Sequence, residues 1–496
     1  MLLSILDTLT TAFNSIWGMM KYDPKAPMLF SSGLFWILFI LFLPVYALLK
    51  RSRWKMVLFV VCFSLYFYYK SSGLFFLMLI GTSLIDWSLS HLIYKLKYNS
   101  ARLCVMWLSI LISLSILGYF KYANFFLWNW NQMVEGNFQP LDVILPVGIS
   151  FYTFQSISYV VDVYKKRISP SRNWLDYLFF LSFFPALVAG PIVRADYFLP
   201  QLEKNRRAST EEIWGGLWLI IVGVIKKALI ADYISQYNDL IFDEPTIYTG
   251  VQALMGVLGY TMQIYCDFSG YSDMAIGLAL MMGFKLGINF DSPYQSCNLT
   301  EFWRRWHISL SSWLRDYVYI PLGGNRKGVV RTYLNNFLTM LIGGLWHGAA
   351  WKFVFWGAMH GVGLIIHKAS KPWLSRIPDN FLTKFIFWAI TFVYVSLLWV
   401  FFRAASFSDS LLIIKNIFID FNWNQLPQFC LARPAWCIMM AVLIIFHFVP
   451  QKWADGVQVL FVKMNWGLKL IVFLISVQLV IEFMSEEVAP FIYFQF

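Results

Sequence analysis

Long apolar runs are the feature that most constrains how this chain can fold. The segments Met28–Leu49 and Leu103–Phe120 contain no charged residue, and each is close to the roughly 20 residues that a helix needs to cross a bilayer. We count about 10–12 such runs, some of them incomplete. Of the 496 residues, 59% are hydrophobic and 13% are charged, against about 45–50% and about 25% in soluble domains. The sequence therefore predicts an all-α, polytopic membrane protein.

The N-terminal stretch Met1–Pro27 differs from the apolar runs that follow it. It has no basic start, and polar residues dilute its apolar ones, so we interpret it as an interfacial extension and not as a secretory signal. Residues 28–496 contain no long linker or internal repeat and are expected to form a single transmembrane domain. The six cysteines include no C-x-x-C pair, and we expect them to be small core residues.

Basic loops predict the orientation of the chain. The net charge of +12 comes from lysines and arginines that cluster beside apolar runs, as the positive-inside rule requires, so nucleic-acid binding is excluded. Lys50–Lys55 should be cytoplasmic, which places the N-terminus outside. Leu178–Val193 lies between two basic stretches and contains two prolines. We expect it to be re-entrant or broken; the alternative is a proline-kinked span with an imperfect charge rule.

Seven charged residues and a histidine gather in Glu301–Gly328. Wound as one helix, Phe302–Tyr317 collects its tryptophans on one arc and its arginines on the adjoining side, with His307 on the border. This pattern predicts a helix in the membrane interface, with tryptophans at headgroup level. A simple anchor explains the tryptophans and arginines, but it does not need the histidine.

A glycine-rich basic turn, Pro321–Gly328, follows this helix. It lacks the spacing of a phosphate loop, but a basic cytoplasmic edge suits the phosphates of coenzyme A or of a carrier protein's prosthetic group. The positive-inside rule accounts equally well for each arginine taken alone.

Three further histidines, His347, His360 and His367, lie in apolar sequence that is expected to be inside the membrane, where ionisable groups are functional candidates. His360 and His367 stand about 10.5 Å apart along a helix, too far to share a zinc ion with bonds of about 2.0–2.1 Å, so no metal site is predicted. Glycines surround His347 at positions 343, 344 and 348, which permits close approach of backbone or ligand. A neutral imidazole in such a place can activate a hydroxyl. Because no G-x-S-x-G elbow is present, direct transfer assisted by a general base is favoured.

The remaining charges in apolar sequence have simpler interpretations. Asp86 is expected to hydrogen-bond within the helix bundle. Lys226 and Lys227 should snorkel from a helix end, whereas Asp267 and Asp273 are expected to brace the fold.

Three motifs resemble the membrane-bound O-acyltransferase (MBOAT) superfamily, in particular the bacterial branch typified by the alginate O-acetyltransferase membrane subunit. They are "QIYCDFSGYSDMAIGLALMMGF", "EFWRRWHISLSSWLRDYVYIPLGGNRKG" and "LIGGLWHGAAWKFVFWGAMHG"; the segments "LPVGISFYTFQSISYVVDVYK" and "PFIYFQF" are similar to that branch too. The resemblance implies a multi-helix fold around a funnel through the bilayer. It places the family's invariant histidine on His347 and its second functional histidine on His307. Many relatives carry a polar residue where Ala186 stands, so a ligand contact there is not carried over.

We therefore expect an inner-membrane O-acetyltransferase for an exported, alginate-like polysaccharide. Its acyl donor would be a cytoplasmic thioester, namely acetyl-CoA. Acetyl-CoA would act as a co-substrate, and no tightly bound cofactor is expected. His347 would be the general base, and His307 would orient the donor or stabilise the oxyanion. The donor-binding candidates are Arg304, Arg315, Arg326, Trp303, Trp346 and Asp316.

The expected partners are an extracytoplasmic SGNH-type protein that relays the acyl group, the polysaccharide export machinery and the lipid bilayer. D-alanyl transfer toward teichoic acid, from a carrier-protein donor, is an alternative within the same class. A transporter or lipid flippase, in which the histidines relay protons, is the alternative from another class; an assembly scaffold would leave both histidines dispensable.

Overall fold

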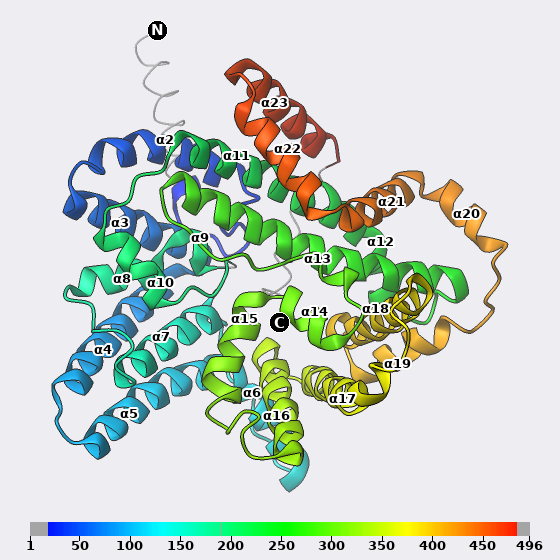
Figure 1. The fold of residues 1–496 in the computed structure, drawn as a ribbon, viewed down its shortest axis with the longest axis horizontal. Helices are drawn as coiled ribbons and strands as arrows, with labels where there is room; N and C mark the ends of the chain where they lie inside the picture. Colours follow the sequence, from blue (N-terminus) through cyan, green and yellow to red (C-terminus); the bar gives the residue numbers. More distant parts are fainter. Residues whose placement is uncertain (1–17, 189, 484–496) are drawn as a thin grey trace. The chain divides into compact units, whose positions relative to one another are not determined.

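The computed structural model describes residues 18–188 and 190–483, and within them the chain forms helices and no strand (Figure 1). The first 17 residues of the expected N-terminal extension, and the terminal "PFIYFQF" motif, lie outside the described residues. The chain divides into two compact units, which are described separately. Unit 1 comprises Met1–Phe120, Asp142–Val188 and Arg194–Arg206, and unit 2 comprises Lys121–Leu141, Ala189–Val193 and Arg207–Phe496.

Unit 1 is a helical bundle around aromatic side chains. Its helices are α2 (Gly33–Leu49), α3 (Arg53–Ser72), α4 (Phe76–Lys95), α5 (Asn99–Leu117), α7 (Ile149–Tyr164), α8 (Trp174–Ser182), α9 (Phe184–Leu187) and α10 (Ala195–Glu203). Buried Asp86 on α4 accepts hydrogen bonds from Ser109 on α5, at 2.7 Å, and from Ser156 on α7. This carboxylate therefore joins three helices, and the prediction that it hydrogen-bonds within the bundle is confirmed.

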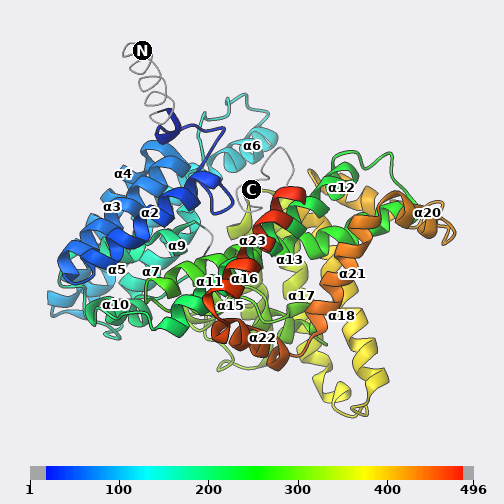
Figure 2. The same ribbon diagram turned by 90° about the horizontal axis from the view of Figure 1, so that it is seen from above.

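Unit 2 contains the longest helix, α13, and the candidate site histidines His307 and His347. Its elements are α6 (Ala123–Val134), α11 (Thr210–Val224), the π-helix η3 (Ile225–Ala231), α12 (Asp232–Asp243), α13 (Gly250–Met281), η4 (Pro293–Gln295), α14 (Leu299–Arg305), α15 (Ile308–Leu314), the π-helix η5 (Arg315–Tyr319), α16 (Val329–His347), α17 (Trp351–Leu374), α18 (Phe381–Arg403), α19 (Phe407–Asn416), α20 (Gln425–Ala432), α21 (Pro434–Phe448), α22 (Gln451–Lys463) and α23 (Trp466–Phe483) (Figure 2). α6 follows directly on a π-helix, η2 (Gly118–Tyr122).

Glycines bring two helix pairs of unit 2 into backbone contact. A Cβ at Gly223 of α11 would lie 2.5 Å from the carbonyl oxygen of Gly270 on α13, and one at Gly216 would lie 2.6 Å from that of Gly277. Helices in membranes associate through such small residues, because they allow dense van der Waals packing. α16 and α17 pack in the same way, through Gly344 and Gly357.

Ion pairs join η3, α12 and α13; Lys227, Asp232 and Asp267 are buried, whereas Lys226 and Asp273 are partly exposed. Lys227 lies 2.7 Å from Asp232 and 2.5 Å from Asp267, and Lys226 lies 2.7 Å from Asp273. The prediction that the lysines snorkel was wrong for Lys227, because the buried carboxylates of Asp232 and Asp267 hold it inside the protein. Lys226 is partly exposed and pairs with Asp273. The prediction that Asp267 and Asp273 brace the fold is confirmed.

Five helical stretches of the described residues are long and apolar enough to cross a membrane: Arg53–Lys95, Asn99–Val134, Thr210–Asp243, Phe381–Arg403 and Trp466–Phe483. α20 and α21 make a sixth if this pair, bent by 101°, is one span. The all-α, polytopic architecture is confirmed. The larger count from the sequence included runs that form shorter helices, such as α2, or broken ones, such as α8 and α9.

The cysteines do not all lie in the core. All six are free, but only Cys266 is buried, and Cys62 and Cys104 are exposed on their helices. The expectation of small core residues was therefore wrong for these two, because apolar sequence in a membrane protein also forms the outer surface of helices.

Candidate active site

His347 is the last residue of α16 and is only 3% exposed. Aromatic rings surround its imidazole: the ring centroid of Trp346 lies 4.9 Å away, that of Trp356 5.0 Å and that of Phe402 5.2 Å. These three rings come from α16, α17 and α18. The imidazole is therefore fixed in an apolar, enclosed setting.

Two side chains from the chain segment before α6 cap the end of α16. The Lys121 ammonium group donates to the carbonyl oxygens of Trp346, at 2.7 Å, and His347, at 3.0 Å. The Tyr122 hydroxyl donates to the carbonyl oxygen of Leu345, at 2.8 Å. The last carbonyls of a helix have no partner within the helix, and a cation there also opposes the negative end of the helix dipole. Lys121 and Tyr122 thus fix the end of α16 that carries His347.

The glycines around His347 serve close packing. A Cβ at Gly344 would lie 2.4 Å from the carbonyl oxygen of Phe353 and 2.8 Å from the Cα of Gly357, both on α17. A Cβ at Gly348 would lie 2.1 Å from the ring of Phe353. The expectation of close backbone approach is confirmed, and its reason is the contact between α16 and α17.

His307 lies at a break between two helices and not on a continuous one. α14 ends at Arg305 and α15 begins at Ile308, and His307 has the left-handed backbone conformation, with φ of 43° and ψ of 56°. The prediction of one helix over Phe302–Tyr317 was therefore wrong. Left-handed geometry is uncommon for residues other than glycine.

The chain segment at residues 289–291 explains the break. The carbonyl oxygen of Asn289 accepts from the N–H of Ile308 at 2.9 Å, and the N–H of Asp291 donates to the carbonyl oxygen of Arg305 at 2.9 Å. These bonds satisfy main-chain groups that the break would otherwise leave without partners. The side-chain oxygen Oδ1 of Asn289 lies 3.1 Å from Nδ1 of His307.

Trp346 contacts both candidate histidines. Its ring centroid lies 6.1 Å from that of His307 and 4.9 Å from that of His347. His307 is fully buried, and the ring of Phe268 on α13 packs edge-on against it at 4.6 Å. The structure therefore brings together two catalytic candidates that are 40 residues apart in the sequence.

The tryptophans before His307 are buried in the protein. The Trp303 indole donates to Nδ1 of His360 at 3.3 Å, and Trp306 packs 4.9 Å from Trp399. Their exposed fractions are 8% and 1%. The prediction that they lie at headgroup level was wrong, because their rings complete an aromatic cluster with α17 and α18.

The other two histidines of α17 have separate partners. His360 accepts from Trp303, whereas Nδ1 of His367 lies 2.8 Å from the hydroxyl of Thr300. Among the described residues, no three histidine, cysteine or acidic side chains lie close enough together to hold a metal ion.

The arginine candidates lie at the surface. Arg304, Arg315 and Arg326 are exposed. The Arg315 guanidinium lies 2.7 Å from Asp316, and the hydrogen bonds between them raise its pKa above the ordinary value. Of the six donor-binding candidates, Trp346 contacts the histidines and Trp303 contacts His360. Arg315 pairs with Asp316, and Arg304 and Arg326 are exposed elsewhere on the chain.

Sequence reasoning missed Lys121, Tyr122 and Asn289. A signal for Lys121 was present, because it is the single charged residue between Arg102 and Glu135. An isolated charge at membrane depth marks a functional candidate. Asn289 gave no such signal, since asparagine is common in loops.

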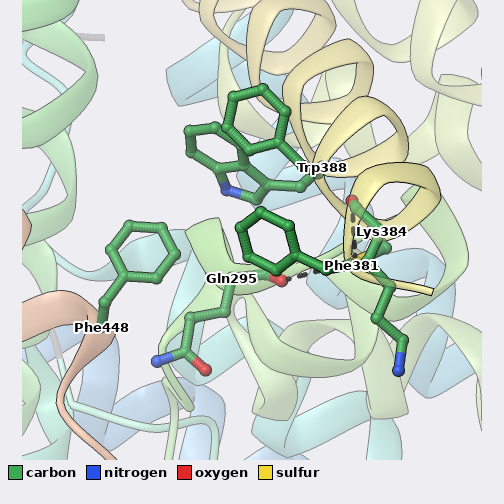
Figure 3. Close-up of a pocket in the computed structure, with 7 residues that line it drawn as sticks. Gln295, Phe381, Lys384, Trp388 and Phe448 are labelled. Atoms are coloured by element: carbon green, nitrogen blue, oxygen red, sulfur yellow. Dashed lines mark hydrogen bonds between the residues drawn. The ribbon is translucent and has the colours of Figure 1, made fainter.

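A cavity of about 420 Å³ lies at the start of α18, apart from the two histidines (Figure 3). Its lining is mainly aromatic and consists of Gln295, Cys297, Phe381, Lys384, Phe385, Trp388 and Phe448. The indole of Trp388 donates to the carbonyl oxygen of Tyr294 at 2.7 Å. None of the candidate site residues lines this cavity.

The arrangement around His347 and His307 suits proton transfer. Two imidazoles share one tryptophan neighbour in an environment of low polarity, where electrostatic and hydrogen-bonding effects are stronger than in water. Histidine is the side chain most often used as a general base near neutral pH.

Comparisons with known proteins show which family and which relatives the chain resembles. Residues 105–408 match the model of MBOAT, the membrane-bound O-acyltransferase family. The chain is 39% identical to the peptidoglycan O-acetyltransferase of Helicobacter pylori over 386 residues, which cover 73% of each chain. It is 38% identical to the probable alginate O-acetylase AlgI of Pseudomonas putida, over 95% of this chain and all of the relative. It is 28% identical to the teichoic acid D-alanyltransferase of Bacillus subtilis, over 74% of this chain and 95% of that protein.

Proposed function

This chain belongs to the membrane-bound O-acyltransferase family and is a multi-pass membrane acyltransferase, and on that premise we propose that it transfers acetyl groups from cytoplasmic acetyl-CoA toward an exported polysaccharide. We place it in the inner membrane with its N-terminus outside, because the basic loops then face the cytoplasm. Acetyl-CoA is a co-substrate in this proposal.

The observation that carries the proposal is the placement of His347. Its imidazole lies at the end of a helix that Lys121 and Tyr122 cap, among three aromatic rings and beside the ring that also contacts His307. A buried, oriented imidazole is the equipment that general-base catalysis of acyl transfer needs.

The proposed reaction is a direct transfer. His347 takes the proton of the acceptor's hydroxyl group. The oxygen of that hydroxyl attacks the carbonyl carbon of the thioester at the same time, and a tetrahedral oxyanion forms. The C–S bond then breaks, the ester carbonyl re-forms, and coenzyme A leaves as a thiolate that receives the proton from the imidazolium. All atoms balance, and no acyl-enzyme is needed.

The donor and the partners are proposed from the surface and from the relatives. Exposed Arg304, Arg315 and Arg326 would meet the phosphates of acetyl-CoA, since guanidinium groups bind phosphate in a bidentate manner. We propose that an extracytoplasmic relay protein, of the SGNH type, and export machinery carry the acetyl group onward to the polymer.

D-alanyl transfer is the second candidate within the class. The relative from Bacillus subtilis supports it, because that protein is a teichoic acid D-alanyltransferase. The higher identity to two O-acetyl-transferring relatives favours acetyl. The alternative from another class is a transporter. In a transporter, neither His307 nor His347 would need to contact a thioester.

The test uses the full chain in phospholipid vesicles with radiolabelled acetyl-CoA. Alginate, peptidoglycan and teichoic acid are offered separately as acceptors, and both the label on each polymer and the released coenzyme A are measured. In parallel, a deletion strain of the host is complemented with each variant, and alkali-labile acetate in its envelope polymers is quantified. The strain supplies any relay protein that the vesicles lack.

Three histidine variants separate catalysis from structure. His347→Gln and His307→Gly should abolish transfer; glycine at 307 suits the left-handed backbone there. His91→Gln is the matched control, because His91 lies in unit 1 and contacts Trp87. Equal transfer by wild type and His347→Gln would refute the proposal, and label only from a D-alanyl carrier donor would favour the second candidate.

A further inference from the structure

Asn289 holds His307 through both its main chain and its side chain. Its carbonyl oxygen accepts from the N–H of Ile308, and its side-chain Oδ1 lies 3.1 Å from Nδ1 of His307. Asn289 is only 1% exposed. The side-chain amide of Asn289 is therefore held in place. The other neighbours of this amide decide whether it donates to the imidazole or accepts from it.

Ser309 determines which end of the Asn289 amide faces His307. The main-chain N–H of Ser309 lies 3.2 Å from Oδ1 of Asn289, and an N–H only donates, so this atom is the oxygen. The Ser309 hydroxyl accepts from the N–H of Ile192 at 3.0 Å and directs its own hydrogen to Oδ1 at 2.9 Å. The Asn289 NH₂ group in turn donates to the Ser272 hydroxyl at 3.2 Å.

The assignment of the amide fixes the tautomer of His307. The Ser309 hydroxyl also lies 3.4 Å from Nδ1 of His307, but it directs its hydrogen to the nearer Oδ1 of Asn289, at 2.9 Å. The carbonyl oxygen of Asn289 has no hydrogen to give, so the hydrogen of this contact belongs to the imidazole Nδ1. In a neutral imidazole the lone pair is then on Nε2. The rings of Phe268 and Trp346 that pack against His307 make an apolar environment that disfavours a charged imidazolium.

We propose that Asn289 is a positioning residue that holds His307 with its hydrogen on Nδ1, so that His307 offers Nε2 to the transfer reaction as a hydrogen-bond acceptor. This inference rests on the proposed function. A lone pair on Nε2 repels the oxyanion of a tetrahedral intermediate. Of the two roles expected for His307, oxyanion stabilisation is thereby removed, and His307 orients a reactant by accepting from its N–H or O–H group.

The tautomer itself is measured without turnover. The full chain is labelled with ¹⁵N-histidine in phospholipid vesicles, and the His307 signals are identified by their loss in His307→Gln. One-bond ¹⁵N–¹H coupling then shows which ring nitrogen carries the hydrogen. Coupling at Nδ1 is expected, whereas coupling at Nε2 in the wild type would overturn the proposal.

Variants of the two ends of the Asn289 amide complete the test. Asn289→Leu removes the acceptor and should lose the Nδ1 coupling and lower kcat at least about tenfold, with the KM for acetyl-CoA within about twofold. Ser272→Ala removes the partner of the NH₂ end and should keep both the coupling and kcat within about twofold of wild type.

The outcomes distinguish this inference from the proposed function. If wild-type protein transfers no acetyl group, the proposed function fails, while the coupling still tests the tautomer. If Asn289→Leu does not fold, the wild-type coupling decides alone. If a folded Asn289→Leu protein keeps the Nδ1 coupling and the kcat of the wild type, Asn289 does not position His307.

Discussion

The ammonium group of Lys121 donates to the carbonyl oxygen of His347 at 3.0 Å, across 226 residues of sequence. Together with its bond to Trp346, this contact ends the helix that carries the candidate base. The position of His347 therefore depends on a residue that is distant in the sequence.

Lys121→Met is expected to lower both stability and transfer. It leaves two carbonyl groups at the end of α16 without their donor, which costs about 1–3 kcal/mol for each buried group. Thermal unfolding in detergent and transfer of label are measured together. Lys352→Met is the matched control, because Lys352 donates to the carbonyl oxygen of Ala404 at the end of α18. It should lower stability with a smaller loss of transfer; equal losses of transfer in both variants would contradict the account.

Gly344→Ala is expected to separate α16 from α17. The added Cβ would lie 2.4 Å from the carbonyl oxygen of Phe353, so the helices must move apart, which typically costs about 1–3 kcal/mol. Gly81→Ala is the control, since Gly81 lies within α4 and a Cβ there meets nothing within 4 Å. Alanine at that position should leave the unfolding temperature unchanged or raise it, because it favours helix by about 0.5–1 kcal/mol. A Gly344→Ala protein as stable as wild type would refute the close packing.

Lys227→Met is expected to be strongly destabilising. It leaves the carboxylates of Asp232 and Asp267 inside the protein without the cation that they share, a loss of about 3–5 kcal/mol. Lys285→Met removes a half-exposed partner of Glu212 and should cost under about 1 kcal/mol. Unfolding temperatures of the two variants in the same detergent test the difference. Similar small shifts for both would contradict a structural role for the buried cluster.

Arg304→Ala and Arg326→Ala are expected to raise the KM for acetyl-CoA about threefold each, with kcat unchanged. The effect should fade as salt is added, because exposed charges are screened. Arg315→Ala should have less effect, since Asp316 already pairs with that guanidinium. Steady-state kinetics at two salt concentrations provide the measurement, with Lys452→Ala on α22 as the control. Unchanged KM values in both arginine variants would exclude Arg304 and Arg326 as contacts of the donor.

The sequence was sufficient for the fold class, and it singled out His347 and His307 as candidates whose catalytic roles stay predictions. Apolar run length predicts membrane helices, and isolated histidines at membrane depth predict a site. The break at His307 was not predictable from helical periodicity, because its cause is hydrogen bonding to residues 289–291. The burial of Trp303 was missed for a similar reason, since its partner His360 lies on another helix. Local patterns do not report such long-range contacts.

The claim that His347 is the general base is tested most directly by separating donor binding from chemistry. Equilibrium binding of acetyl-CoA and the single-turnover rate of transfer are measured for wild type and His347→Gln in the same vesicles. The account predicts an affinity within about twofold and a transfer rate lower by about 10²–10⁴-fold, the usual contribution of a general base. A His347→Gln protein that transfers acetyl within about tenfold of the wild-type rate would contradict it.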